Sequence, residues 1–541
     1  MKKLHIRLLS GILAALILSG CRAKAPAPQQ DAVDNTDEQQ ESDEQTTAPF
    51  MPAEGAGIGY SPADRLFSLC FDPSGSMNPL YGINVVNDQL MCLLFEGLFR
   101  IGPGLEPEPV LCESWSTDDG INYVFRLKPD VYFHSGAILC ADDVIYSINR
   151  AAGGSKYATR FKNIRAMSAA DPLTLKIMLK EADYGFPALL DLPIIRTSTS
   201  DQYPPDGTGP YVLHIYSTAN YLTSFPQHRD FESLPLSRIY LRKVESIHLS
   251  RDFSARRIDL LDRDPLSVVQ FNIHSDYETR YYETANFIYL GLNTARGAMR
   301  DPDVRRVISG IIDYGELTEE CFLGAVTPAP LVLSPKLSYY DASLEAELKE
   351  DAPDFTDLAI AAELQDTDND GFWDVSGRLS NINITLIVNT ENPYRLEAAR
   401  AVHATLSLKG FSVNLKELSY KEYVSALQSG SFDIFLGEVK LTPDYDLSSV
   451  LGAGGEVNYG KASGYDSLLS AIHAAPDPES KREAARALCE YAANDCAIIP
   501  IAYKRRAVLT HPGVVTGITP SVSGVFGDFK SWKIDLGLVR S

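Results

Sequence analysis

The chain has 541 residues, of which 45% are hydrophobic and 22% are charged, and its formal net charge is −22. This length exceeds what one ordinary hydrophobic core accommodates, so we expect two or three lobes. The strongly negative charge argues against nucleic acid or an anionic membrane surface as a partner of the folded body.

The first 21 residues are typical of an export signal. Lys2, Lys3 and Arg7 precede the apolar run "LLSGILAALIL", which is too short to span a bilayer comfortably. The run ends in "LSGC", which resembles a bacterial lipobox. The resemblance implies cleavage before Cys21, a lipid on its thiol, and a place on the outer face of the cytoplasmic membrane or in the periplasm. The alternative is an ordinary secretory signal with a chance cysteine. No later stretch reaches about 18 uninterrupted apolar residues, so we expect no other membrane span.

Residues 22–59 are predicted to form a flexible tether. This stretch is rich in Pro, Gln and acids, and between Asp31 and Glu54 it has eight acids and no Lys or Arg. It has too little apolar surface to fold. The sequence therefore predicts a folded body, residues 60–541, held off a membrane by an acidic arm.

The cysteines favour free thiols over disulfides. Eight are present, and Cys21 is assigned to the lipid. The remaining number is odd and no two have C-x-x-C spacing, which disfavours a zinc or redox site. Most lie in apolar runs such as "LMCLLF", where a thiol acts as a small apolar side chain.

The body begins with a predicted strand, "RLFSLCF", and a turn-rich loop, "DPSGSMNPL". The run "VVNDQLMCLLF" has apolar residues at helical spacing and predicts a helix. After an Asp-Asp-Gly turn, the apolar residues Tyr123, Phe125 and Leu127 alternate with polar ones and predict a half-buried strand. A second short strand, "VYF", is predicted to follow it.

The next stretch, "YFHSGAILCADD" at residues 132–143, combines the residue types of an active site. As local structure, His134 lies in a turn from strand to helix. Asp142 and Asp143 fall in the first turn of the predicted helix "ADDVIYSINRA", where carboxylates meet the positive end of the helix dipole. Catalysis would require a nucleophile and an orienting acid beside His134. The turn explains the residues without them, so we interpret the stretch as scaffold.

A longer pattern covers residues 110–151. It consists of acid-x-Trp, Asp-Gly, an aromatic-x-Phe-x-Leu strand, Val-x-Phe-x-x-Gly, and Ala-x-Asp-Val-x-Tyr-Ser at a helix start. The residues that carry it are Glu113, Trp115, Asp119, Gly120, Tyr123, Phe125, Leu127, Val131, Phe133, Gly136, Ala141, Asp143, Val144, Tyr146 and Ser147. This region resembles the family 5 extracellular solute-binding proteins, the oligopeptide-, dipeptide- and nickel-binding components of ABC importers. Cys140 departs from the pattern, because the family often has a helix-capping Thr there.

The resemblance extends over nearly the whole body, from about Arg65 to Trp532. The further matching stretches are "EGLFR", "GTGPYVL", "RRIDLL", "LGLNTARGAMRDPDVRRVISGIID", a helix–strand–helix–strand order at residues 398–439, and "CAIIPIAYKRR". The resemblance implies an α/β, two-lobed periplasmic-binding-protein-like fold (type II, the large cluster with an extra subdomain). Lobe one would comprise residues 60–286 and 500–541, with the extra subdomain at residues 83–198. Lobe two would comprise residues 287–499.

The resemblance implies a binding protein and not an enzyme. Such a protein captures a peptide ligand in the interlobe cleft, needs no cofactor, and delivers the peptide to ABC permease subunits in the membrane. In "KLTPDYDLSSVL", the residues Pro443, Asp444 and Tyr445 fall on the family's Ala-Asp-Tyr loop, whose Asp holds the α-amino group of the peptide. A solvated acidic turn is the alternative. The usual following Pro is replaced by Asp446 and Leu447, which leaves the ligand class open.

Other candidate ligand contacts follow from the same resemblance. Ser76, Met77 and Asn78 lie in the first loop, which borders the cleft in the family, and could offer hydrogen bonds to an extended ligand. The alternative is a loop that merely turns the chain. Tyr211 on the "GTGPY" stretch is a candidate too, with core packing as its alternative.

The stretch "DTDNDGFWD" resembles the start of an EF-hand loop. Asp366, Asp368 and Asp370 take positions 1, 3 and 5, and Gly371 follows, whereas the twelfth position has Gly377 in place of Glu. A calcium ion here would be structural, and the alternative is an acid-rich turn. No other metal site is predicted, because no two of the nine histidines are spaced four residues apart.

Other functions remain as alternatives. The fold alone does not decide between a peptide binder and a binder of a nickel chelate, a sugar or another small solute. A signalling lipoprotein that presents a sensed peptide to a receptor is a further alternative. G-x-S-x-G, H-E-x-x-H and Walker motifs are absent, and a secreted hydrolase would depend on His134 or a nearby serine.

Overall fold

The structure is a computed structural model that describes residues 66–539 except 82–84, 218, 270–271 and 376–379. The chain divides into two units, Met1–Ser61 and Pro62–Ser541, and all the described residues lie in the second. The predicted signal peptide, the lipobox with Cys21 and the tether lie outside the described residues. Among the residues described, no helix has the length and apolar character needed to cross a membrane.

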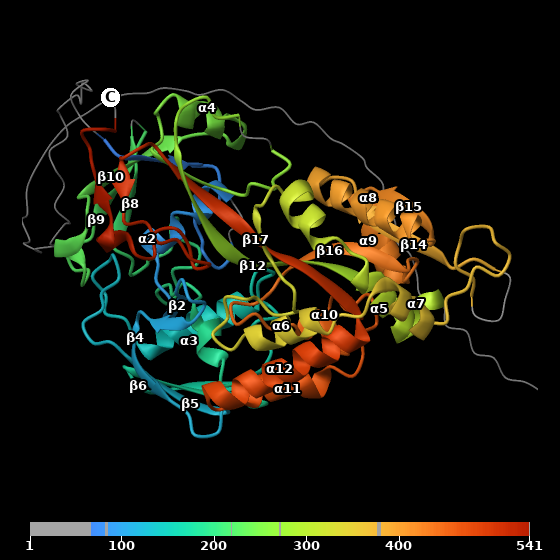
Figure 1. Cartoon of the computed structure of the whole chain (residues 1–541). Helices are drawn as coiled ribbons and strands as arrows, with labels where there is room; N and C mark the ends of the chain where they lie inside the picture. Colours follow the sequence, from blue (N-terminus) through green and yellow to red (C-terminus); the bar gives the residue numbers. More distant parts are fainter. Residues whose placement is uncertain (1–65, 82–84, 218, 270–271, 376–379, 540–541) are drawn as a thin grey trace, which may run out of the picture. The chain divides into compact units, whose positions relative to one another are not determined.

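Two long antiparallel strands form the centre of the largest sheet. They are β12 (Glu278–Leu292) and β17 (Ile498–Thr510), and their pairing runs from Glu278 opposite Thr510 to Gly291 opposite Ile498. Figure 1 shows the two strands side by side. The register shifts between Glu283 and Phe287, so the ladder is irregular near its middle.

The remaining strands of this seven-stranded sheet attach to the two long ones. They are β11 (Leu260–Arg263) and β13 (Val326–Pro328) on β17, and β16 (Ile434–Lys440), β14 (Asn383–Asn389) and β15 (Ser412–Leu418) in succession from β12. The parallel strands β14, β15 and β16 are joined by α8 (Pro393–Leu408) and α9 (Tyr420–Ser429). The predicted helix–strand–helix–strand order of residues 398–439 is therefore confirmed.

Two four-stranded sheets are built mainly from the first half of the chain. One has the order β1 (Ser68–Phe71), β10 (Arg238–Lys243), β9 (Asn220–Ser224), β8 (Tyr211–Ile215). The other has the order β4 (Cys112–Ser116), β5 (Asn122–Leu127), β7 (Thr174–Leu179), β6 (Ile164–Asp171). Two-stranded sheets pair β2 (Phe99–Ile101) with β3 (Pro107–Pro109) and β18 (Val515–Thr516) with β19 (Lys533–Ile534). In β5 the buried residues alternate with exposed ones, as predicted.

The helices confirm part of the predicted pattern. They are α1 (Val85–Asp88), α2 (Met91–Leu94), α3 (Ala141–Ala152), α4 (Leu249–Ser254), α5 (Pro302–Gly310), α6 (Ala342–Glu350), α7 (Phe355–Ala361), α10 (Ser448–Leu451), α11 (Asp466–Ala474) and α12 (Pro478–Asp495), besides α8 and α9. The helix predicted at "VVNDQLMCLLF" is instead two short ones, α1 and α2. The break follows Asp88. The carbonyl of the preceding Asn87 accepts a tight-turn hydrogen bond from Leu90, and the Asn87 side chain is bonded to the backbone of Asp72.

The predicted strand "VYF" is not formed either. Only one isolated bridge joins Tyr132 and Ile138 there. The helix that follows is confirmed as α3. Its first turn is stabilised by side-chain hydrogen bonds in addition to the helix dipole. The Asp143 carboxylate accepts hydrogen bonds from the backbone N–H groups of Cys140 (3.0 Å) and Thr197 (2.8 Å).

The predicted free thiols are present. All seven cysteines after Cys21 are free, and Cys70, Cys112, Cys489 and Cys496 are buried. Burial raises the pKa of the Cys70 and Cys489 thiols to about 12.

Aromatic packing fixes the sheet against the segment that follows β16. The rings of Phe287 on β12 and Tyr503 on β17 stack with centroids 5.0 Å apart. Tyr445, five residues beyond β16, packs against Tyr503, with the two ring centroids 5.6 Å apart. All three rings are buried, so the loop carrying Tyr445 is anchored on the central strands.

Glu96, in the "EGLFR" stretch, joins three segments of the first half of the chain. Its carboxylate accepts hydrogen bonds from Thr208 (3.2 Å) and Arg229 (3.1 Å) and lies 3.4 Å from the Nε2 atom of His228. Burial alone would raise the pKa of Glu96, but His228 and Arg229 lower it to about 2. A carboxyl group with a lowered pKa stabilises the fold wherever it is ionised.

We expect Glu96→Gln to reduce the free energy of unfolding by about 2–4 kcal/mol at neutral pH, because the substitution leaves Arg229 without its buried counter-charge. The Glu96 contribution is complete above the unfolded-state pKa, about 4.5, and is lost as the pH falls toward the folded-state value, about 2. Urea unfolding of both proteins should therefore show a stability difference that narrows steadily below about pH 5. A difference that is the same at pH 7 and at about pH 3 would contradict this assignment.

Candidate functional site

The loop after β16 presents two carboxylates on either side of a buried tyrosine. Tyr445 has a left-handed backbone conformation (φ 59°), and its N–H donates to the Thr442 carbonyl, which closes a turn. The Tyr445 ring is buried, and its flanking residues Asp444 and Asp446 both line the same pocket. The packing of Tyr445 on Tyr503 thus fixes where these carboxylates lie.

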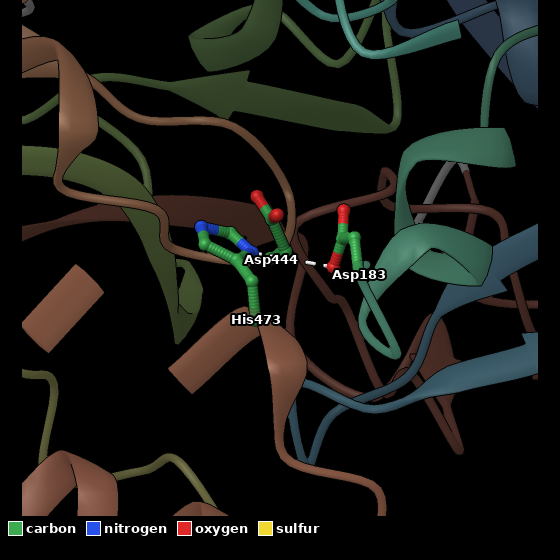
Figure 2. Close-up of side chains that lie close together, drawn as sticks. All are labelled: Asp183, Asp444 and His473. Atoms are coloured by element: carbon green, nitrogen blue, oxygen red, sulfur yellow. Dashed lines mark hydrogen bonds and ion pairs between the residues drawn. The ribbon is translucent and has the colours of Figure 1, made fainter. Parts of the chain in front are cut away.

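His473, in the last turn of α11, connects this loop to a distant segment. Its Nε2 atom lies 3.1 Å from Oδ1 of Asp446, and its Nδ1 atom lies 3.2 Å from Oδ1 of Asp183. Figure 2 shows Asp183, Asp444 and His473 gathered together, with the Asp183–His473 interaction dashed. The His473 carbonyl also accepts the N–H of Tyr184 at 2.8 Å, so backbone and side chain both join α11 to this segment.

Asp183 is held by its own surroundings. It lies between β7 and the short 3-10 helix η1 (Phe186–Leu190), and its Oδ1 accepts the N–H of Gly185 at 2.9 Å. The buried hydroxyl of Tyr123, on β5, donates to the Asp183 carbonyl at 2.6 Å. Asp183 therefore approaches His473 from a turn that is held by these two hydrogen bonds.

The ionisation of the cluster follows from burial and proximity. Burial would lower the pKa of His473, but hydrogen bonds and charges from Asp183 and Asp446 raise it to about 11, so the ring is an imidazolium at neutral pH. The pKa of Asp446 is lowered, because the hydrogen bond and charge of His473 outweigh burial. Burial, and then the charges of Asp446 and Asp183, raise the pKa of Asp444 to about 6.

Asp444 is the member of the cluster with unused bonding capacity. Its Oδ1 atom is buried and has no hydrogen-bond partner. The pocket around it is a partly open hollow with a cavity volume of about 20 Å³, room for about one water molecule. It is lined by Gly185, Leu333, Tyr339, Asp444, Tyr445, Asp446, Leu447, Leu469, Ile472, His473, Lys481 and Leu488. A carboxylate at the edge of such an apolar wall can hold a cationic group with little competition from water.

The donor atoms of the cluster are also close enough to share a metal ion. One ligand atom each from Asp183, Asp444 and His473 lie within 4.8 Å of one another. The only other such group among the described residues is Asp366, Asp368 and Asp370. There, Asp366 accepts the N–H groups of Asp370 and Gly371 at 3.0 Å each, as in an acid-rich turn. Calcium at that loop stays a prediction.

The structure brings only some of the predicted ligand contacts into this pocket. Asp444 and Tyr445 line it, as a ligand contact requires, but their role as such stays a prediction. Sequence reasoning missed Asp183 and His473 as members of the site. They are 290 residues apart, and no local motif marks either one.

The other predicted contacts are accounted for by packing and turn formation. Met77 is completely buried, and the Asn78 amide donates to the Ser200 carbonyl at 2.6 Å. Ser76 is exposed, and its hydroxyl accepts the Asn78 N–H at 3.1 Å. None of the three lines the pocket around Asp444.

Tyr211 lies elsewhere, in the core. Its hydroxyl donates to the Leu236 carbonyl at 2.6 Å, and its buried ring packs edge-on against Phe529 with the centroids 5.7 Å apart. The packing alternative considered for Tyr211 accounts for these contacts.

His134, at the centre of the active-site-like stretch, has structural contacts. Its Nε2 atom lies 3.0 Å from the Gly209 carbonyl, and its ring packs edge-on against Phe225 with the centroids 5.2 Å apart. Burial lowers the pKa of His134 despite the Gly209 hydrogen bond. The ring therefore joins the turn after residue 133 to the "GTGPY" stretch.

Comparisons with known proteins agree with this architecture. Residues 106–455, more than half of the chain, match the profile of "Bacterial extracellular solute-binding proteins, family 5 Middle". The glutathione-binding protein GsiB of Escherichia coli K12 is 25% identical over 286 residues, which cover 49% of this chain and 55% of GsiB. The chain thus spans little more than half the length of this relative.

Solved structures confirm the predicted two-lobed fold class. The oligopeptide-binding protein AppA from Bacillus subtilis, in complex with a nonapeptide, has a TM-score of 0.61 and 18% identity, covering 87% of this chain and 98% of AppA. NikZ from Campylobacter jejuni, in complex with Ni(L-His), has a TM-score of 0.62 and 19% identity, covering 86% of this chain and 99% of NikZ. The lobe boundaries given above stay predictions.

We expect His473→Ala to reduce the free energy of unfolding by about 1–3 kcal/mol, because it leaves the carboxylates of Asp183 and Asp446 without their shared partner. The His473 side chain is 25% exposed, so we expect a smaller loss of stability than for the removal of a fully buried ion-pair partner. Urea unfolding at neutral pH measures it. His403→Ala, on the partly exposed surface of α8, is the matched control, and equal losses in the two variants would show that the pairing contributes nothing.

Proposed function

Because the chain belongs to the bacterial extracellular solute-binding proteins of family 5, we propose that it is the lipid-anchored, extracytoplasmic substrate-binding component of an ABC importer. Proteins of this family are transport binders and not enzymes. In the proposed function, the protein captures peptides in the cleft between its lobes and delivers them to a permease in the membrane.

One observation carries the peptide assignment: the buried, unpartnered Oδ1 atom of Asp444 in the pocket. A peptide presents an ammonium group at its amino terminus, and a carboxylate out of water pairs strongly with an ammonium. The apolar side chains on the pocket wall, among them Leu333 and Leu469, favour a solute with an apolar side chain next to that ammonium. The position of Asp444 on the family's amine-binding loop supports the same assignment.

The contacts of His473 support capture by closure. By the predicted boundaries, Asp183 and Tyr184 belong to lobe one, and His473 and Asp446 belong to lobe two. The Asp183–His473 pair and the Tyr184–His473 backbone hydrogen bond then join the lobes beside the pocket. Hinge closure that forms these bonds would bury the solute, and the closed form would dock on the permease.

The relatives differ in what they bind, which keeps the solute itself open to test. GsiB is named for glutathione, AppA was solved with a nonapeptide, and NikZ with Ni(L-His). We favour peptides for this chain because Asp444 is the carboxylate of the pocket that has a buried oxygen without a hydrogen-bond partner, and because several apolar side chains line the pocket beside it. Whether the captured peptide is imported or sensed depends on the protein that receives it, and we propose that this partner is the permease.

We expect Asp444→Asn to abolish peptide capture, because it removes the negative charge and keeps the size of the side chain. Native mass spectrometry of the full-length protein, purified in detergent without refolding and then mixed with a peptide pool, measures the bound peptides. His134→Ala is the control: its affinity should stay within tenfold of the parent, about 1.4 kcal/mol. Peptide binding that survives in Asp444→Asn would refute the anchoring role, and a loss in folded His134→Ala would refute the scaffold role of that residue.

We expect a fatty acid on Cys21, because "LSGC" has the lipobox pattern. Cells grown with labelled palmitate should incorporate label into the parent protein and none into Cys21→Ser. Mass spectrometry of the mature amino terminus gives an independent reading. A mature chain that begins elsewhere, or that carries no lipid, would show an ordinary secretory signal instead.

A further inference from the structure

We infer that Asp183, Asp444 and His473 form a binding site for a divalent transition-metal ion such as Zn²⁺. The inference deepens the proposed function, on which it rests for the role of the pocket, by naming a second class of occupant. The metal and the ammonium of a peptide would compete for the same Asp444 carboxylate.

The spacing of the donor atoms fits a small ion. Ligands of a tetrahedral zinc ion lie about 2.0 Å from the metal and hence about 3.3 Å from one another. The Nδ1 atom of His473 and Oδ1 of Asp183 are already 3.2 Å apart. One ligand atom from each of Asp183, Asp444 and His473 lies within 4.8 Å of the other two, so side-chain movements of up to about 1.5 Å bring all three to the spacing of ligands on one ion.

Asp444 can coordinate without breaking an existing hydrogen bond, because its buried Oδ1 has no partner. Asp183 keeps its second bond, from the N–H of Gly185, which fixes the direction of its Oδ1. The metal would replace the proton that now lies between His473 and Asp183.

Asp446 supplies the support that a metal-binding histidine usually has. Ligating histidines donate their other ring N–H to a carboxylate or carbonyl, which fixes the tautomer and the ring orientation. The Nε2 atom of His473 lies 3.1 Å from Oδ1 of Asp446. The Asp446 oxygen is itself held by the N–H (2.9 Å) and the hydroxyl (2.6 Å) of Ser448. Nδ1 is therefore the ring atom that faces Asp183 and the proposed ion.

Charge and donor type decide the class of metal. Three carboxylates surround one imidazole, and the pocket's other cation, Lys481, lies over the ring of Tyr339, with Nζ 4.5 Å from the ring centroid. Because the ion displaces the proton of His473, a divalent ion adds one net positive charge to the cluster and reduces its excess negative charge. One imidazole nitrogen with two carboxylate oxygens suits Zn²⁺, Co²⁺ or Ni²⁺, whereas Ca²⁺ and Mg²⁺ require more oxygen ligands. The remaining coordination position would be open toward the pocket, as in sites that exchange a ligand.

The test uses the full-length protein, freed of metal with EDTA and titrated with Zn²⁺ and Co²⁺, with Mg²⁺ as the negative control. Native mass spectrometry counts bound ions, and the visible absorption of Co²⁺ reports coordination by protein ligands. We expect one Zn²⁺ per chain and no Mg²⁺. Asp183→Asn, Asp444→Asn and His473→Gln should lose the ion, because each replaces a carboxylate or an imidazole by a neutral amide, a much weaker zinc ligand, with little change of shape.

Two further variants separate a built site from general binding to an acidic protein. Asp446→Asn keeps all three ligands and removes the carboxylate that orients His473, so Zn²⁺ affinity should fall by about 10–100-fold without vanishing. Asp368→Asn alters the other acidic cluster and should leave Zn²⁺ binding unchanged. The absence of Zn²⁺ binding, or binding that persists in folded His473→Gln, would overturn the inference.

The same samples distinguish this inference from the proposed function. Peptide capture is measured in the EDTA-treated protein and again with one equivalent of Zn²⁺. Capture without any Zn²⁺ binding would overturn the metal site and leave the peptide assignment standing. Zn²⁺ binding without peptide capture would overturn the peptide assignment and leave the metal site standing. With both present, Zn²⁺ should weaken peptide binding, and undiminished binding at saturating Zn²⁺ would refute a shared Asp444.

Discussion

The antiparallel pairing of β12 with β17 is the interaction on which the rest of the structure depends. Strands β11 and β13 attach to β17, and β16, β14 and β15 follow from β12, so the largest sheet has no other centre. The site inherits its position from the same pair. The loop with Asp444 leaves β16, the direct neighbour of β12, and Tyr445 in that loop packs on Tyr503 of β17. A change in the pairing would therefore move the pocket as well as the sheet.

The pocket is defined by its charge balance more than by any single side chain. His473 bonds to Asp183 and Asp446 at 3.2 and 3.1 Å and offsets one of their two negative charges, whereas Asp444 has a buried oxygen with no hydrogen-bond partner. Burial makes an unbalanced carboxylate costly, and this cost is recovered when a cation enters. An ammonium group or a metal ion would each supply the positive charge that Asp444 lacks. The two differ in that a metal ion coordinates several ligand atoms of the cluster at once.

Local patterns predicted local structure well, because they report which side chains are buried. The alternation in β5 and the first turn of α3 were both confirmed. The single helix predicted at residues 85–95 is divided into α1 and α2, and Asn87 in this stretch bonds to the backbone of Asp72, a tertiary contact that spacing does not reveal. For the site, the family motif located Asp444 in the pocket. It gave no sign of His473 or Asp183, which meet only when residues from distant parts of the chain fold together.

The seven free thiols have a consequence for how this chain matures. A thiolate, and not a thiol, attacks a disulfide, so a raised pKa slows exchange. Burial is the first cause of the raised pKa at all seven of these cysteines, from Cys70 to Cys496. A member of an extracellular family would thus reach an oxidising compartment with its sulfur chemistry suppressed by packing. Because all seven of these cysteines are free in the folded chain, they form no native disulfide, and their exposure during a delay in folding is the stage at which wrong cross-links become possible.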